Sequence, residues 1–354
     1  MHRLALYSLV LLVAGTAQIP AGNLTKIWEV RLAELPGSEG MNAAALVYSV
    51  SFAPDGRTLS VVVKDAEARS KFAILSVDDP RRGMTGVKNN GPIADALTSH
   101  ISWSSTGNEV AIPTVFHILA QPWTGCALEH TLHAVFYDSD RVADVQRGFP
   151  DSTILFFDSS CNPIGSWAIK GLWERIDGSP DRHLLVLSNN IPKDTEVIVL
   201  DPLRRKLVRR WQMEETNGTW PVFADSGRAV CAIDGTGRHG VAHCWDVEGD
   251  HEISETTSGN PHGNIAAALH ARRVVLSSYG WRFEFEGFYT EVGSLEKRVV
   301  WDFGTGKEIT SWKSKYQHPA HSQIWEPYPV AISPDGTMVA EGGLGMLTLY
   351  RIQP

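Results

Sequence analysis

The chain has 354 residues, of which 43% are hydrophobic and 20% are charged, a composition that is ordinary for a soluble globular protein with a sizeable core. Its formal net charge is −8 at pH 7. This charge argues against nucleic acid as a partner, because a phosphate backbone binds a clustered basic surface. The basic positions at 204–206 and 209–210 alternate with apolar residues, which indicates the solvated side of a strand.

The first residues have the layout of a secretory signal peptide. A short basic start with Arg3 precedes an apolar run from Leu4 to Gly15 and a small-residue stretch that includes Ala17. We therefore expect residues 1–17 to be cleaved and the mature chain to be exported, to the periplasm or the extracellular space. No later segment is long and apolar enough to span a membrane, so we expect no membrane span in the mature chain.

Residues 24–354 are predicted to form one β-propeller domain. Its first segment, LTKIWEVRL from Leu24 to Leu32, resembles a single strand without a partner nearby in the sequence. The last unit, Val330 to Ile352, stops after its third strand. We expect the early segment to complete that last unit and close a ring, because closure removes exposed strand edges.

Two patterns alternate along the rest of the chain. The first is an apolar strand, a tight turn and another apolar strand, at 50–63, 101–114, 222–234 and 330–343, with weaker copies at 176–188 and 265–278. Pro-Asp-Gly and Ser-Gly sequences at the turns supply the backbone conformations that tight turns need. The second is a strand ending in Asp, a turn, and a strand ending in Trp, at 154–167, 197–211 and 299–312.

Together the patterns predict an all-β fold. Each unit is two hairpins, hence one four-stranded antiparallel sheet, and such sheets bury both faces by stacking around an axis as blades. Turn centres near residues 55, 106, 181, 226, 271 and 335 give six blades. The interval between 106 and 181 is much longer than a typical blade and leaves room for a seventh.

Two long segments are interpreted as insertions between the second and third strands of their blades. One runs from Phe116 to Asp151, and the other from Tyr279 to Leu295. Loops of this type emerge on one face of a propeller, so we expect a partner-binding cleft between them. We expect its walls to consist of seven side chains: Trp123, His130, His133, Trp281, Phe283, Phe285 and Tyr289.

The four cysteines are expected to form two disulfides, which fits an oxidising compartment. Cys231 lies four residues before Gly235, and Cys244 lies four residues after Gly240. A hairpin centred on the Gly235–Gly240 loop therefore places the two thiols directly opposite each other, close enough to bond after small adjustments. Cys126 and Cys161 are paired by elimination.

The chain resembles the WD-repeat superfamily, and in particular exported bacterial propellers of the periplasmic TolB-like kind. Trp245-Asp246 and Trp301-Asp302 carry the dipeptide that gives the superfamily its name, at the expected end of a third strand. The resemblance covers nearly the whole mature chain, but only these two blades have the dipeptide. It implies a propeller that mostly binds other proteins, although a fold does not fix a function.

We expect no catalytic residue, no cofactor and no metal. The histidine pairs 130/133, 239/243 and 318/321 lack a third ligand at a compelling spacing, and no nucleophile elbow is present. The leading hypothesis is a non-enzymatic extracytoplasmic scaffold that binds a protein, peptide or glycan on its loop-rich face. The alternative is a propeller hydrolase or lactonase with acidic and histidine groups in the axial channel.

Overall fold

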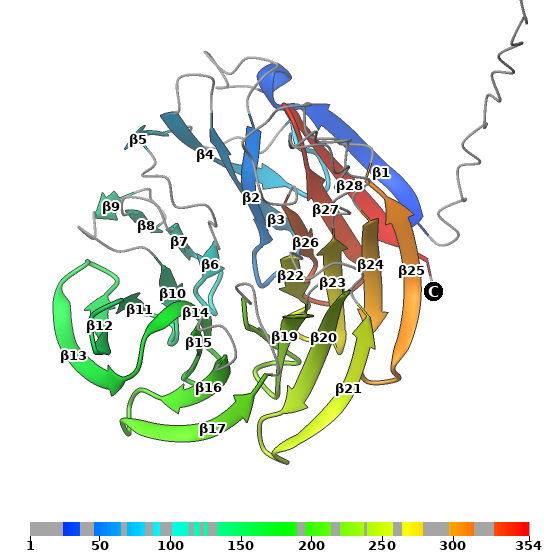
Figure 1. Cartoon of the computed structure of the whole chain (residues 1–354). Helices are drawn as coiled ribbons and strands as arrows, with labels where there is room; N and C mark the ends of the chain where they lie inside the picture. The colour runs from blue at the N-terminus through cyan, green and yellow to red at the C-terminus, as the bar shows by residue number, and fades with distance from the viewer. Residues whose placement is uncertain are drawn as a thin grey trace, which may run out of the picture.

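The computed structural model describes most of the chain, and all structural statements below concern that part. The described residues are 24–35, 46–64, 69–81, 88–92, 101–112, 117–120, 124–126, 133–189, 195–213, 220–236, 239–257, 264–278, 297–314 and 329–353. They form seven four-stranded antiparallel sheets arranged around a central axis (Figure 1). The protein is therefore a seven-bladed β-propeller.

Each of the first three blades is a meander of four consecutive strands. Blade one consists of β2 (Leu46–Phe52), β3 (Thr58–Lys64), β4 (Arg69–Ser76) and β5 (Lys88–Pro92). Blade two consists of β6 (Ser102–Trp103), β7 (Glu109–Ile112), β8 (His117–Ala120) and β9 (Thr124–Cys126). Blade three consists of β10 (Ala134–Phe136), β11 (Arg141–Gln146), β12 (Asp151–Asp158) and β13 (Pro163–Lys170).

Blades four to six repeat the same order. Blade four consists of β14 (Trp173–Ser179), β15 (Leu184–Asn189), β16 (Glu196–Asp201) and β17 (Lys206–Gln212). Blade five consists of β18 (Val222–Ala224), β19 (Ala229–Thr236), β20 (His239–Asp246) and β21 (His251–Thr257). Blade six consists of β22 (Asn264–Ala267), β23 (Arg273–Ser278), β24 (Lys297–Asp302) and β25 (Lys307–Lys313).

Blade seven joins the two ends of the chain. It consists of β26 (Val330–Ile332), β27 (Met338–Gly342), β28 (Met346–Ile352) and β1 (Leu24–Arg31), with β1 as the outermost strand. β1 pairs antiparallel with β28, from Leu24 opposite Ile352 to Arg31 opposite Met346. A short 3-10 helix, η1 (Leu32–Glu34), follows β1. The sequence-based prediction that this segment completes the last blade is confirmed.

The seventh blade lies in the long interval where the sequence left room for one. Blade three occupies it, with its first turn near residue 139. The segment Phe116–Asp151 is therefore not one insertion, and that prediction is wrong: it holds the outer strands of blade two and the inner strands of blade three. The other predicted insertion does fall between a second and a third strand, since β23 ends at Ser278 and β24 begins at Lys297.

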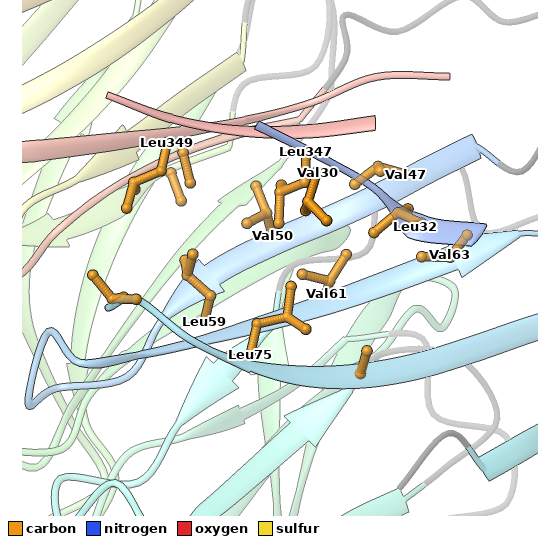
Figure 2. Packing of buried hydrophobic residues seen from close by; sticks show 14 of the residues in the cluster. Val30, Leu32, Val47, Val50, Leu59, Val61, Val63, Leu75, Leu347 and Leu349 are labelled. Carbon is orange, nitrogen blue, oxygen red and sulfur yellow. The ribbon is translucent and has the colours of Figure 1, made fainter. Parts of the chain in front are cut away.

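The core of the molecule is divided among the interfaces between blades. Seven clusters of buried apolar side chains are described, and each joins two neighbouring blades. Figure 2 shows the cluster in which Val30, Leu32 and Leu347 of the closing region meet Val61 and Leu75 of blade one. Successive side chains of a strand point to opposite faces of its sheet. Each blade can therefore bury one face against the preceding blade and the other face against the following blade. Blade seven thus packs on both blade six and blade one.

The cysteine pairing expected from hairpin symmetry is present. Cys231 in β19 lies directly opposite Cys244 in β20, and the two are joined by a disulfide with an S–S distance of 1.95 Å. Cys161 is also disulfide-bonded, and none of the cysteines that the structure describes is free. The side chain of Cys126, its partner by elimination in the sequence, lies outside the described residues.

Candidate functional site: the loop-side mouth of the axial channel

The first strands of the blades line a channel along the propeller axis. Its cavity has a volume of about 200 Å³, and it is lined by residues of β2, β6, β14, β18, β22 and β26 and of the turns beside them. Most of the lining is apolar or neutral polar. Among the described residues it holds two carboxylates, Asp177 and Asp181, and no histidine.

The two ends of the channel differ in the backbone that surrounds them. The turns between first and second strands, and between third and fourth strands, lie at one end, which we call the hairpin side. The loops between second and third strands and the blade-to-blade connections lie at the other end, which we call the loop side. Strands β10, β14 and β18 begin at the loop side, because each follows the connection from the preceding blade.

Three side chains from three consecutive blades meet at the loop side. His133 precedes β10, Arg175 lies in β14, and Trp220 precedes β18 and also lines the channel. The imidazole of His133 meets the indole of Trp220 edge-on, with ring centroids 5.0 Å apart and an interplanar angle of 83°. The Arg175 guanidinium carbon lies 4.1 Å from the Trp220 ring centroid. A cation over an indole at this distance is stabilising, and the arrangement fixes both groups at the channel mouth.

Backbone and carboxylate contacts hold these groups in place. The backbone N–H of His133 donates to Asp144 Oδ1 at 2.9 Å, and Asp144 is fully buried in β11. Asp177, farther down the channel, accepts hydrogen bonds from the backbone N–H groups of Gly178 and Phe223, both at 2.8 Å. Its two oxygens therefore tie blade four to blade five, and this carboxylate has a structural role.

The loop between β11 and β12 presents an aromatic side chain to solvent on the same side of the propeller. Phe149 is 91% exposed, the most exposed large apolar residue described. Its neighbour Arg147 forms an ion pair with Glu174 of β14, with 2.5 Å between Nη1 and Oε1. This contact links the loop to the blade that carries Arg175. Aromatic residues such as phenylalanine are enriched at protein interfaces, so Phe149 offers an anchored aromatic contact to a partner.

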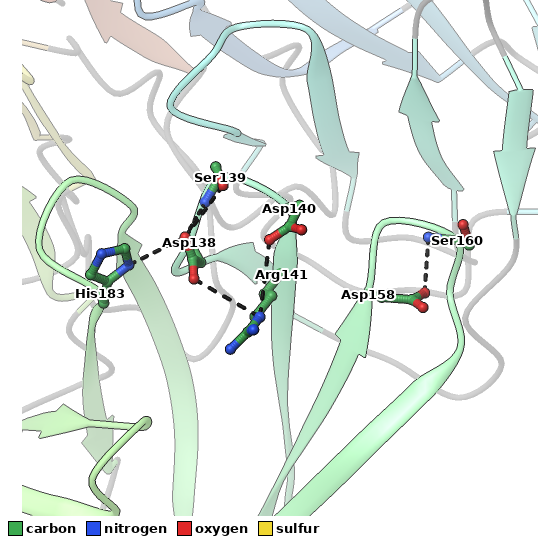
Figure 3. Close-up of polar contacts among 7 residues, drawn as sticks. All are labelled: Asp138, Ser139, Asp140, Arg141, Asp158, Ser160 and His183. Carbon is green, nitrogen blue, oxygen red and sulfur yellow. Dashed lines mark hydrogen bonds and ion pairs between the residues drawn. The ribbon is translucent and has the colours of Figure 1, made fainter.

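A second group of titratable side chains lies on the hairpin side, where Figure 3 shows its contacts. Asp138 of blade three accepts from the backbone N–H of Ser139 at 2.7 Å and lies 3.3 Å from Nδ1 of His183 in blade four. Arg141 lies 3.9 Å from Asp138 and 4.0 Å from Asp140. These contacts join blades three and four through their first turns, so they brace the ring.

Of the seven predicted cleft residues, the structure describes His133. His133 lies at the loop side, as expected for a cleft on that face, and contacts Trp220, which the sequence did not single out. By chain position Trp123 falls between β8 and β9, and His130 falls between β9 and β10. These two residues, and also Trp281, Phe283, Phe285 and Tyr289, lie outside the described residues. Ligand binding by the seven residues stays a prediction.

Phe149, Arg147, Arg175 and Trp220 were missed by sequence reasoning. The segment that holds Phe149 was assigned to an insertion, and Trp220 stands alone before a strand without any local motif. The available signal was the Gly148-Phe149-Pro150 sequence, because glycine and proline are typical of turns at the surface.

Comparison with known proteins bears on the fold alone. No family model matches the chain, and no curated protein matches its sequence. Among solved structures it is similar to a chain of the "Crystal Structure of Mitotic Checkpoint Complex", with a TM-score of 0.57 and 11% sequence identity, over 93% of this chain and 96% of that chain. Since 1017 chains of solved structures match, the likeness identifies a widespread architecture and does not select a function. The comparison therefore agrees with the fold that the sheets show, a β-propeller.

Proposed function

We propose that this protein is a non-enzymatic binding scaffold outside the cytoplasm, and that it engages a protein or peptide partner on its loop side. The observation that carries the proposal is Phe149, which is 91% exposed on a loop anchored by the Arg147–Glu174 ion pair. Together with Trp220 and Arg175 it supplies the aromatic and arginine side chains that dominate protein interfaces. A glycan is a further candidate ligand, because exposed aromatic rings also stack on sugars.

The described channel lining is mostly apolar or neutral polar, which fits a binding role. Of the two carboxylates in the described lining, Asp177 is occupied by two backbone N–H groups. The hydrolase or lactonase alternative requires acidic and histidine groups that converge on one substrate, and the described lining supplies no such pair.

Export is part of the proposal. It is supported by the signal-peptide layout of residues 1–17, by the resemblance to periplasmic TolB-like propellers, and by the Cys231–Cys244 disulfide, since disulfides persist in oxidising compartments. Among the residues that the structure describes, no helix is long and apolar enough to cross a membrane.

The experiment compares two single variants of the mature chain as baits. Phe149→Ala removes the exposed aromatic residue on the loop side. Leu203→Ala is the matched control, because Leu203 is 52% exposed and lies in the turn between β16 and β17 on the hairpin side. We expect proteins captured from the native extracytoplasmic fraction to be retained by the wild type and by Leu203→Ala and lost with Phe149→Ala. Equal capture by all three baits would contradict the proposal.

A further inference from the structure

Three side chains of types that commonly bind metals lie on the third and fourth strands of blade five, whereas the channel is lined by the first strands. His243 is in β20, and Glu252 and Glu255 are in β21. One ligand atom from each residue can be chosen so that all three lie within 4.8 Å of one another. We propose that these three side chains bind a divalent transition-metal cation, zinc in the first instance.

An irregularity in the hairpin brings the three side chains to one face. Residues 252 and 255 are three apart, so simple alternation would place them on opposite faces of the sheet. The register shifts by one residue between Cys244 and Trp245, so that Glu255 lies opposite His243 and Glu252 lies opposite Trp245. Because His243 and Trp245 share a face, both carboxylates join the imidazole there. A bulge of this kind often re-aims a side chain at a functional site.

The same bulge occurs in neighbouring blades without the ligands, which provides an internal comparison. The β12–β13, β16–β17 and β24–β25 hairpins all shift register at the equivalent point. The position of His243 is aliphatic in each of them. The residues at the three positions are Leu155, Pro163 and Ser166 in blade three, Ile198, Leu207 and Arg210 in blade four, and Val299, Glu308 and Ser311 in blade six. The repeat fold therefore does not require this set, and blade five alone among these four has all three ligands.

The surroundings fix the imidazole and leave the carboxylates adjustable. The His243 ring stacks on Trp245 with centroids 5.5 Å apart, and Trp245 stacks on Trp211 of blade four at 5.2 Å. The His243 side chain is 19% exposed, whereas those of Glu252 and Glu255 are 41% and 67% exposed. A preoriented nitrogen ligand with two solvent-exposed oxygen ligands can close on a cation and leaves room for a water ligand.

The distances are close to those of a bound site. Nδ1 of His243 lies 2.6 Å from Oε1 of Glu252 and 3.8 Å from Oε2 of Glu255. Ligands about 2.0–2.1 Å from a tetrahedral zinc lie roughly 3.3 Å apart. Glu252 must therefore withdraw and Glu255 approach, each by less than about 1 Å, which are small movements for exposed side chains.

The donor set selects the class of cation. An imidazole nitrogen with two carboxylate oxygens suits zinc and its neighbours in the transition series, whereas calcium and magnesium prefer sites made only of oxygen. The same property offers a spectroscopic test, because a paramagnetic Cu²⁺ ion bound at Nδ1 would lie beside the stacked indole of Trp245 and quench its fluorescence.

The test uses the mature chain without a polyhistidine tag, stripped with a chelator and titrated with Zn²⁺ by calorimetry. Two site variants take residues from other blades, His243→Val from blade six and Glu255→Ser from blades three and six. The matched control is Glu308→Gln, which alters the blade-six equivalent of Glu252. We expect the wild type and Glu308→Gln to bind one Zn²⁺ that His243→Val does not bind. We expect Glu255→Ser to bind it at least 10–100-fold more weakly, roughly the loss that follows removal of a ligand's supporting contacts.

Ca²⁺ and Cu²⁺ provide the second readout. We expect Ca²⁺ to give no comparable heat, and Cu²⁺ to quench tryptophan fluorescence in the wild type more than in His243→Val. Identical Zn²⁺ stoichiometry in the wild type and His243→Val would overturn the proposal, as would Ca²⁺ binding as tight as Zn²⁺ binding. Circular dichroism of each variant shows that a lost heat reflects a lost ligand and not an unfolded chain.

Discussion

Two adjacent residues of β24 form ion pairs that differ in burial, and burial decides how much the loss of a partner destabilises the fold. Arg298 lies 3.4 Å from Glu341 of blade seven, and both side chains are 0% exposed. The indole N–H of Trp312 also donates to Glu341, at 3.4 Å. Lys297, one residue earlier, pairs with Glu308 at 3.9 Å with about half of each side chain in water. The first pair is removed from solvent at the joint between blades six and seven.

Removal of the buried carboxylate should therefore be costly. We expect Glu341→Ala to lower the free energy of unfolding by about 3–5 kcal/mol, because it leaves the Arg298 charge buried beside a cavity. Glu308→Ala should cost less than about 1 kcal/mol, as exposed pairs do. Urea denaturation measures both. A Glu341→Ala variant within 1 kcal/mol of the wild type, on the scale expected for exposed pairs, would show that the buried pair does not hold the joint.

The carboxyl of Asp335 predicts that the stability of the fold decreases at acidic pH. Partial burial acts to raise the pKa of this carboxyl, but hydrogen bonds from Ser333 and Thr337 outweigh it and hold the pKa below its usual value. A lowered pKa in the folded state contributes stability above the unfolded value of about 3.9, and this contribution is lost as the pH falls through the folded pKa. We expect the stability advantage of the wild type over Asp335→Asn at pH 6 to shrink by pH 3. Urea midpoints at the two pH values check this, and an unchanged advantage would contradict it.

At the scale of single elements, β1 matters most for closure of the ring, because this N-terminal strand completes the blade formed by the C-terminal strands. Val30 and Leu32 enter the cluster shared with blade one, and the Trp28 indole N–H donates to the Val77 carbonyl at 2.6 Å. The strand therefore covers the edge of β28 and links blade seven to blade one.

Val30→Pro should disrupt this closure. Val30 is 2% exposed and pairs with Leu347, so proline removes a strand hydrogen-bond donor and a packed side chain. We expect a broader, less cooperative thermal transition and aggregation through the uncovered β28 edge. Lys26→Ser in the same strand is the control, because Lys26 is exposed and should leave melting unchanged. If Val30→Pro melts like the wild type, β1 does not close the ring.

The sequence predicts hairpins well where the turns carry distinctive residues. Pro334-Asp335-Gly336 marks a first turn, and the Cys231–Cys244 pairing follows from hairpin symmetry alone. The turn of blade three was not counted because this turn, Asp138-Ser139-Asp140, has neither proline nor glycine. The strands β8 and β9 are too short to show a clear strand periodicity, so their segment was interpreted as part of an inserted loop.

The candidate sites were harder to predict because they depend on register and on blade contacts. His243 was paired by spacing with His239, yet its structural neighbours are Glu252 and Glu255, which a bulge turns to its face. Periodicity cannot locate a bulge. Trp220, Arg175 and His133 come from three consecutive blades, so only the stacking of these blades brings them together.

At the scale of the whole molecule, export and covalent structure are linked. We expect non-reduced peptide maps of exported protein to contain linked Cys231 and Cys244 peptides, with a shift to separate peptides after reduction. Reduction should lower the stability by about 2–4 kcal/mol, the usual contribution of such a bond. An unlinked pair in exported material would contradict the prediction.

The central claim is that the loop side of this propeller binds a partner, and site-specific photo-crosslinking tests it most directly. A photoreactive phenylalanine is placed at position 149 on the loop side or at position 203 on the hairpin side, and the mature chain is irradiated with the native extracytoplasmic fraction. The account predicts a discrete adduct from position 149, suppressed by an excess of unlabelled wild type but not of Phe149→Ala, and no such adduct from position 203. No adduct at position 149, or the same adduct at both positions, would contradict it.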